Sequence, residues 1–392
     1  MFFAHNKEHT FICVAHGFPL HCVLMFIRKV AAVLALAACV CRGVEPMDVS
    51  SQIERIREEH EVPALAVAAM DEGQLVAIGA AGLRSAKDDK PVTLDDQWIV
   101  SSITKSMTAS LAAMLVEDGR IRWKSTIAEV LPDLAYQVDA SWREVPLELL
   151  LVHRAGAPHD PPADLWSEAQ AQHGTPQEQR TAFVKGLLKN APTHRPGTHW
   201  EYSDSGYAIA GAMIERAAGK PLEELLRTRI FEPIGLHSAG FGAPATPGQL
   251  DQPWGHKGYE PPFTPVPPGP DADYPPAIAA AATVHMSIAD LARYAQWHVD
   301  GARGDGWLLS DESFEKLHTP PEGQSYAMGW TVTKRRWANG IVLMHPGQNT
   351  NSYAVVWLGP KENTCFVAAC NADCQGAQDA CDDAIRLLIN EF

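Results

Sequence analysis

Ser102 and Lys105 are three residues apart at the start of a segment whose apolar residues recur with helical spacing, at Ile103, Met107, Leu111 and Leu115. Residues at positions i and i+3 share one face of a helix, so we expect the Lys105 amine to reach the Ser102 oxygen. A serine hydroxyl becomes an effective nucleophile when an adjacent base takes its proton, and a desolvated lysine with a lowered pKa can be that base. The start of a helix also offers free N–H groups to a developing oxyanion. The pair therefore predicts acyl-transfer chemistry.

This spacing alone is a weak signal, because Ser313 and Lys316 repeat it and a serine before a helix is commonly an N-cap. Two later segments add to it. Tyr202-Ser203-Asp204 follows a Pro-Gly pair and precedes an apolar helical segment, so we expect Tyr202 on a loop that enters a helix. His345-Pro346-Gly347 directly follows the apolar run 341–344, which predicts the end of a strand where another group approaches the backbone closely.

These three motifs, in this order, resemble the signature of the penicillin-recognising serine hydrolases. The similarity is to the branch that contains class C β-lactamases, DD-peptidases and family VIII carboxylesterases. Three further segments resemble that branch, namely residues 150–156 (LLVHRAG), 286–291 (MSIADL) and 326–330 (YAMGW). The resemblance covers roughly residues 48–392 and implies the β-lactamase/transpeptidase-like fold. The G-x-S-x-G element of α/β-hydrolases is absent from the sequence, which argues against that fold.

The resemblance implies a role for each motif residue. Ser102 is expected to be the nucleophile, Lys105 the group that keeps its proton mobile, and Tyr202 a second general acid/base. An unperturbed tyrosine has a pKa of about 10, and we expect Lys105 and His345, as nearby cations, to lower it. The oxyanion hole is expected from the backbone N–H groups of Ser102 and Gln348, and Gly347 is expected to leave room for substrate along the strand.

This chemistry requires no metal or cofactor, and the sequence predicts none. His153, His159 and Asp160 could be read as metal ligands. However, the resemblance implies that the histidine of the LLxHxSG segment is structural. A second H-x-G, which begins at His256, has no apolar run before it and is interpreted as chance.

Two residues depart from the family pattern. Asp204 stands where many relatives have Asn, and an ionised carboxylate can only accept hydrogen bonds from a substrate, whereas an amide also donates. Asp204 could instead pair with Lys105 and raise its pKa. His345 replaces the lysine of the β-lactamases and binds a substrate carboxylate less well when neutral. Both departures favour an ester or a small amide as substrate. A β-lactamase or D-alanyl-D-alanine carboxypeptidase is the alternative, and a penicillin-binding sensor that does not turn over is the alternative of another class.

The periodicity predicts an α/β (α+β) fold, an antiparallel sheet flanked by helices from both chain ends plus an inserted, mainly helical lobe. Residues 53–60 and about 381–388 have helical spacing, and the expected strands are 64–70, 75–78, 329–333, 341–344, 352–358 and 364–370. The α/β lobe is predicted at about 48–100 and 321–392, and the helical lobe at about 101–320. Residues 243–276 contain eleven of the 29 prolines, and we interpret this segment as either a stiff surface loop or a wall of the substrate cleft.

The N-terminal 41 residues are predicted to be a leader. Met25, the basic pair Arg28-Lys29 and the short apolar run 30–38 resemble a signal peptide rather than a membrane span, and residues 1–24 are consistent with a start codon chosen too early. Residues 36–39 (LAAC) resemble a lipobox that would lipidate Cys39, but residues 35–37 (ALA) equally suit ordinary signal peptidase. We therefore expect an exported protein, periplasmic or lipid-anchored to the outer face of a bacterial membrane, with no transmembrane span in its mature form.

The remaining composition restricts the partners. The 392-residue chain carries a net charge of −15, which argues against nucleic acid and anionic membranes as partners and leaves a small molecule or a peptide as substrate. The sequence leaves the oligomeric state open. Four cysteines cluster near the C-terminus, and a disulfide within Cys370, Cys374 and Cys381, free buried thiols, or zinc each remain open. Cys365 and Cys370 should lie on opposite faces of a strand and should not pair with each other.

Overall fold

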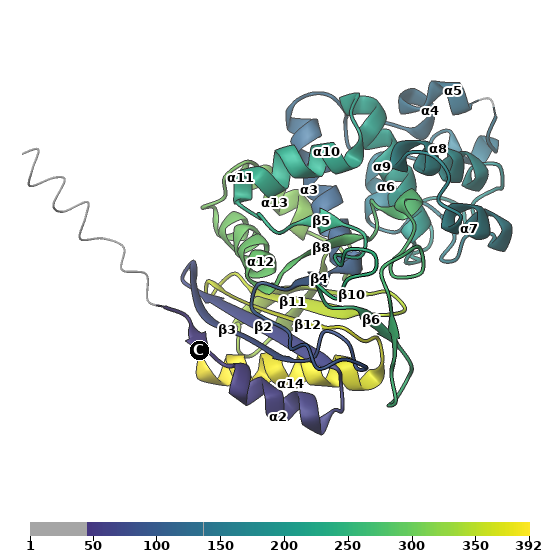
Figure 1. Ribbon diagram of the computed structural model, residues 1–392. Coiled ribbons are helices and arrows are strands. Elements are labelled where there is room, and N and C mark those ends of the chain that lie inside the picture. Colours follow the sequence, from purple (N-terminus) through teal and green to yellow (C-terminus); the bar gives the residue numbers. More distant parts are fainter. Residues whose placement is uncertain (1–44, 136) are drawn as a thin grey trace, which may run out of the picture. The chain divides into compact units, whose positions relative to one another are not determined.

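A seven-stranded sheet brings the two ends of the described chain together (Figure 1). Its strand order is β1-β3-β2-β12-β11-β10-β9, and neighbouring strands are antiparallel except for the short β1–β3 pair. The strands are β1 (Met47–Asp48), β2 (Ala64–Asp71), β3 (Gln74–Gly82), β9 (Thr331–Arg335), β10 (Gly340–Gln348), β11 (Tyr353–Gly359) and β12 (Thr364–Cys370). The predicted fold class, an antiparallel sheet built from both chain ends and flanked by helices, is confirmed.

Hydrophobic packing covers both faces of this sheet. The central strands β2 and β12 are almost entirely apolar and buried, as expected for strands with both faces covered. Helices α2 (Ser50–Glu59) and α14 (Gln375–Glu391) cover one face, and α12 (Ile288–Arg303) packs on the other (Figure 1). Cys365 contributes to the core on the α12 side and Cys370 to the core on the α14 side, so the prediction that they occupy opposite faces is confirmed.

The middle of the chain is mainly helical, as the periodicity predicts. Its helices are α3 (Thr104–Glu117), α4 (Ile127–Val130), α5 (Pro132–Ala135), α6 (Leu147–Leu151), α7 (Ala163–Gln170), α8 (Pro176–Leu187), α9 (Asp204–Ala218), α10 (Leu222–Leu226), α11 (Glu232–Ile234) and α13 (Asp311–His318). Short helical turns lie at η1 (Ser101–Ile103), η2 (Ala140–Trp142), η3 (Arg227–Phe231) and η4 (Pro276–Ile278).

Two small sheets in this region were not predicted. One has the order β4-β8-β5, formed by β4 (Gln97–Ile99), β8 (Val284–Ser287) and β5 (Gly240–Phe241), and the other pairs β6 (Gly255–Lys257) with β7 (Thr264–Val266). Each strand has two to four residues, which is too short for an alternating pattern to be recognised. The β6–β7 hairpin lies inside the proline-rich segment. Its His256 is buried and hydrogen-bonds with Ala86 N–H and with the Asn371 carbonyl, so the second H-x-G holds loops together.

This computed structural model describes residues 45–135 and 137–392. The predicted leader, including the candidate lipidation site Cys39, lies outside the described residues. Pro46–Phe392 form one compact unit. Within the described part of the chain, no helix combines the length and the apolar character needed to cross a membrane.

The C-terminal cysteines are free thiols in the structure. Cys365, Cys370, Cys374 and Cys381 are all buried, and none is joined to another, so the structure differs from the predicted disulfide within Cys370, Cys374 and Cys381. Burial raises the pKa of each of these thiols and keeps it protonated. Cys370 and Cys381 serve as small apolar residues in the core between the sheet and α14.

Candidate active site

Ser102 lies in the 3₁₀ turn η1, between strand β4 and helix α3. The preceding residue, Ser101, has φ of 45°, a left-handed conformation that is uncommon for a residue other than glycine. Its hydroxyl donates a hydrogen bond of 2.7 Å to the Gln348 carbonyl at the end of β10. This contact ties the turn to the strand. Ser102 itself is largely buried, with 8% of its surface exposed.

Lys105 is fully buried on α3, one turn after Ser102. Its Nζ donates to Ser102 Oγ at 3.0 Å and to the Ala281 carbonyl at 3.1 Å, and it lies 2.6 Å from Asp204 Oδ1. Burial opposes the charge of Lys105, but Asp204 and Tyr202 outweigh it and raise its pKa. The predicted reach of the amine to the hydroxyl is confirmed. The lowered lysine pKa is not found, because Asp204 supplies an ion pair.

Tyr202 lies on the loop before α9, where Ser203 caps the helix by accepting a hydrogen bond from Gly206 N–H. Its ring centroid is 4.7 Å from Lys105 Nζ, so the buried amine lies against the tyrosine ring. Burial raises the pKa of Tyr202, and the Lys105 cation only partly offsets this. The expectation of a lowered tyrosine pKa is therefore wrong. The three residues nevertheless form one cluster, in which Lys105 hydrogen-bonds to Ser102 and lies against the Tyr202 ring.

His345 is buried in β10, and both of its ring nitrogens have partners within the protein. Nε2 lies 2.9 Å from the Tyr326 hydroxyl and Nδ1 lies 2.6 Å from the Pro346 carbonyl. Burial and the nearby Lys105 cation lower the pKa of His345 to about 3, so the ring is neutral. Nδ1 then donates to the carbonyl and Nε2 accepts from Tyr326. His345 cannot act as the second cation beside Tyr202, and neither ring nitrogen is left to bind a substrate carboxylate.

Gly347 allows β10 to pass directly against the turn that carries Ser102. A Cβ atom at this position would lie 2.0 Å from the Val100 carbonyl oxygen and 3.3 Å from Ser102 N. The next residue, Gln348, is therefore held close to the Ser102 backbone. The Ser102 N–H also belongs to the first turn of a helix, where backbone donors have no partner in the helix. This proximity supports the predicted oxyanion hole, which remains a prediction.

A cavity of about 350 Å³ reaches Asp204. Its walls include Trp166 from α7 and Tyr274 from the proline-rich segment, whose rings meet edge to face at 6.0 Å. Asp160, one of the residues that could be read as a metal ligand, also lines it. Tyr274 places the proline-rich segment in the wall of a cavity that reaches Asp204, the ion-pair partner of Lys105, which supports the cleft interpretation. Such a mostly apolar cavity suits the hydrocarbon part of a substrate.

An aromatic group around the Tyr202 loop was largely missed from the sequence. His153 has φ of 58°, and its Nδ1 accepts a hydrogen bond of 3.1 Å from Ser203 N–H. Its ring lies 4.3 Å from the Tyr202 ring and 4.7 Å from the Tyr326 ring, measured between centroids. His159 reaches the Tyr202 carbonyl at 2.8 Å. Both histidines thus position the Tyr202 loop, and only the family segment around His153 carried a signal for this role.

Comparisons with known proteins agree with this geometry. Residues 49–390 match the family model described as Beta-lactamase. The chain is 30% identical to penicillin-binding protein 4 of Amycolatopsis lactamdurans over 295 aligned residues. This alignment covers 74% of each of the two chains. It is 29% identical over 188 residues to lovastatin esterase of Penicillium rubens, covering 43% of this chain and 46% of the esterase. A D-amino acid amidase structure from Ochrobactrum anthropi superposes with a TM-score of 0.68 at 20% identity, over 87% of this chain and 99% of the amidase. The chain belongs to the β-lactamase family.

Proposed function

We propose that the protein is a serine hydrolase that cleaves an ester or a small amide through an acyl intermediate on Ser102. The observation that carries this proposal is the 3.0 Å hydrogen bond from Lys105 Nζ to Ser102 Oγ, with the Tyr202 ring centroid 4.7 Å from the same amine. Ser102 Oγ attacks the substrate carbonyl carbon and loses its proton to the cluster. The bond to the leaving group then breaks, and the leaving group takes that proton. Water attacks the acyl ester next, releases the acid and restores the Ser102 hydroxyl.

The protonation state of the Ser102, Lys105 and Tyr202 cluster decides which group accepts the Ser102 proton. Lys105 is held as a cation by Asp204, and the raised pKa of Tyr202 keeps its hydroxyl protonated at rest. The reactive form is the one from which the cluster has lost one proton. A Tyr202 phenolate beside the Lys105 cation is the arrangement that keeps the ion pair with Asp204 intact. Activity should therefore rise with pH, and the three groups should titrate as a unit. Positioned acid/base groups of this kind typically contribute a rate factor of about 10² to 10⁴.

The Asp204 carboxylate favours esters and small amides over β-lactams as substrates. Its Oδ1 is 2.6 Å from Lys105 Nζ, and a carboxylate has no hydrogen to donate to a substrate carbonyl. An acylamino side chain would then leave its carbonyl unpaired, which costs about 1–3 kcal/mol when the group is buried. His345 is neutral and cannot attract a carboxylate. The likeness to lovastatin esterase agrees with an ester substrate, whereas the likeness to penicillin-binding protein 4 keeps the β-lactam alternative open.

The test is intact-protein mass spectrometry after incubation with p-nitrophenyl butyrate, a fluorophosphonate and nitrocefin. The wild type should form a transient butyryl adduct and a permanent phosphonyl adduct on Ser102. Ser102→Ala should lose both adducts and all hydrolysis while keeping its thermal unfolding temperature. Ser313→Ala is the matched control, because Ser313 has the same spacing to a lysine but bonds Glu117 at the start of α13. Hydrolysis that survives in Ser102→Ala would overturn the proposal.

Substrate preference can be tested at Asp204. Asp204→Asn restores a donor with almost no change in size, so the ratio of kcat/KM for nitrocefin to that for p-nitrophenyl butyrate should rise. An unchanged ratio would mean that Asp204 acts only through Lys105. A nitrocefin adduct that persists without turnover in the wild type would instead favour the penicillin-binding sensor.

Export is proposed on the composition of the leader, namely the basic pair Arg28-Lys29 followed by a short apolar run. Expression of the full chain in a bacterium, followed by fractionation and N-terminal sequencing, tests it. Incorporation of labelled palmitate that is lost in Cys39→Ser would identify a lipid anchor, and cleavage after Ala37 would identify the free form.

A further inference from the structure

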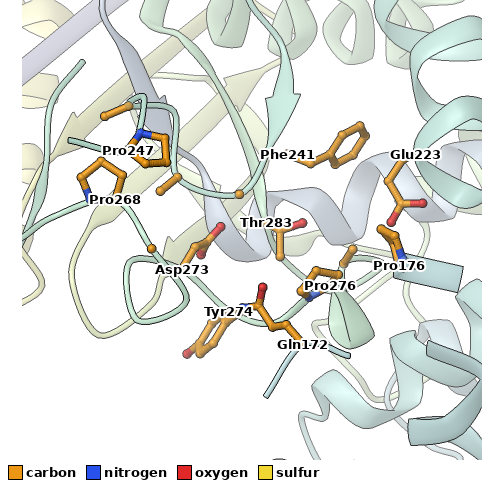
Figure 2. Close-up of a pocket in the computed structure, with 15 residues that line it drawn as sticks. Gln172, Pro176, Glu223, Phe241, Pro247, Pro268, Asp273, Tyr274, Pro276 and Thr283 are labelled. Atoms are coloured by element: carbon orange, nitrogen blue, oxygen red, sulfur yellow. The ribbon is translucent and has the colours of Figure 1, made fainter. Parts of the chain in front are cut away.

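A second cavity, of about 360 Å³, shares a lining residue with the cavity that reaches Asp204. Figure 2 shows the residues that line this second cavity. The proline-rich segment contributes Pro247 and Pro268 to it, and the end of β5 contributes Phe241. Tyr274 lines this cavity and also the one that reaches Asp204, so the tyrosine forms a shared wall between them. Nothing in the proposed acyl transfer uses the second cavity.

Two polar atoms that line this cavity are buried and have no hydrogen-bond partner among the described residues. They are Asp273 Oδ2 and Thr283 Oγ1. The other oxygen of Asp273 accepts a hydrogen bond of 2.9 Å from Asn349 Nδ2, which holds the carboxylate in place. In the view of Figure 2, Asp273 lies between Thr283 on one side and the rings of Pro247 and Pro268 on the other. A buried polar group without a partner is costly, so an acceptor pair of this kind is expected to serve a ligand.

Thr283 is also held in an unusual conformation. Its φ is 89°, which a β-branched residue rarely adopts, and its side chain is 3% exposed. The backbone on both sides is fixed, because the Thr283 carbonyl accepts from Gly242 N–H at 2.7 Å and Val284 N–H donates to Thr104 Oγ1 at 3.3 Å. The strand pairing therefore keeps the Thr283 hydroxyl in the cavity wall at the expense of backbone strain.

The charged residues that line the second cavity indicate the charge of the ligand that it binds. Its acidic residues are Asp273 and Glu223, and none of the lining residues is Lys, Arg or His. Glu223 is already paired with Arg180 at 2.9 Å, so Asp273 is the carboxylate that keeps a free oxygen. Burial raises the pKa of Asp273 to about 6 despite the bond from Asn349, as expected for a carboxylate without a cation beside it.

We propose that this cavity binds an organic cation, a primary ammonium carried on a small apolar or aromatic body. The ammonium has three N–H donors, which suit Asp273 Oδ2 and Thr283 Oγ1. The apolar body packs on Phe241 and the proline rings, and the Tyr274 face adds a cation–π contact. Because Tyr274 separates the two cavities, binding of the cation does not require a free Ser102.

Calorimetric titration of the full chain with benzylamine tests the proposal, with benzyl alcohol as the neutral analogue and benzoate as the anionic one. The wild type should bind benzylamine more tightly than benzyl alcohol and should not bind benzoate. Asp273→Asn should weaken benzylamine binding roughly ten- to hundredfold, the range for one charge-assisted hydrogen bond, and leave benzyl alcohol binding unchanged. Thr283→Val should weaken benzylamine binding by a smaller factor. Asp271→Asn is the matched control, because Asp271 is an exposed carboxylate two residues away that does not line the cavity.

The two cavities are distinguished by blocking Ser102. Protein labelled with the fluorophosphonate, and Ser102→Ala, should both bind benzylamine as the wild type does. Loss of binding after labelling would place the amine at Ser102 and overturn the proposal. Equal binding of benzylamine and benzyl alcohol, or unchanged benzylamine binding in a folded Asp273→Asn, would overturn it as well. These readouts do not depend on hydrolysis, so they remain decisive if the proposed function fails.

Discussion

Gly347→Ala should disable the enzyme by forcing β10 away from the nucleophile turn. The added Cβ would lie 2.0 Å from the Val100 carbonyl oxygen, whereas a carbon and an oxygen atom that are not bonded rarely come within about 3 Å. The obstacle is backbone rather than a flexible side chain, so the strand and the turn must separate by about 1 Å. The Ser101 hydroxyl, which now holds the Gln348 carbonyl at 2.7 Å, would be pulled with the turn.

A separation of this size acts on catalysis more than on folding. A displacement of about 1 Å can cost roughly 10²-fold in rate, and loss of one oxyanion donor costs about 10² to 10³-fold in kcat. We therefore expect kcat for p-nitrophenyl butyrate to fall by about 10² to 10³-fold, with a smaller change in KM. Overpacking a well-packed core typically costs about 1–3 kcal/mol, so the variant should still fold. Steady-state kinetics and urea unfolding measure the two effects separately.

Gly340→Ala is the matched control, since it adds the same methyl group at the start of the same strand. The nearest heavy atom to its Cβ would be 3.5 Å away, an ordinary contact. Its kcat should stay within about threefold of the wild type. The reasoning is refuted if Gly347→Ala keeps wild-type kcat while folded, or if Gly340→Ala loses as much activity as Gly347→Ala.

Three further outcomes follow from the structure. Asp204→Asn removes a carboxylate that raises the pKa of both Lys105 and Tyr202, so the cluster should lose its proton at lower pH. The acidic limb of the kcat–pH profile should therefore move to lower pH, and a limb that stays in place would contradict the assignment. Burial lowers the pKa of His318 to about 3, below its unfolded value of about 6.5; its contribution to stability is therefore complete above about pH 6.5 and is lost as the pH falls toward 3. Urea unfolding at about pH 7 and about pH 4.5 should show this loss, and it should be smaller in His318→Phe. Iodoacetamide should leave Cys365 and Cys381 unmodified in the native protein, because burial keeps these thiols protonated, and should modify both in urea. Peptide mapping identifies the modified residues, and labelling of the native protein would show that these thiols are open to solvent.

Local patterns in the sequence were enough for the elements of the fold. Six strands of the seven-stranded sheet and the helices α2, α3, α9 and α14 follow from runs of apolar residues with periods of 2 or 3.6, whereas the two-residue strand β1 was not predicted. The small sheets β4-β8-β5 and β6-β7 could not be predicted, because their strands are two to four residues long and are defined by pairing with distant segments. The choice among a disulfide, free buried thiols and zinc could not be made from the sequence for a related reason. Cysteine spacing does not show whether the thiols face one another or fill separate places in a core.

The sequence by itself determined which residues assemble at the candidate site. Ser102, Lys105 and Tyr202 were identified from motif order, and the helical spacing alone placed the amine within reach of the hydroxyl, as the 3.0 Å contact shows. Only the tertiary structure decided their protonation, because a pKa depends on burial and on charges brought in from distant parts of the chain. Asp204 raises the pKa of Lys105, and burial neutralises His345 and offsets the effect of Lys105 on Tyr202. The unpartnered oxygen of Asp273 is likewise visible only in the fold, since the cavity around it is built from segments that the sequence does not show to be neighbours.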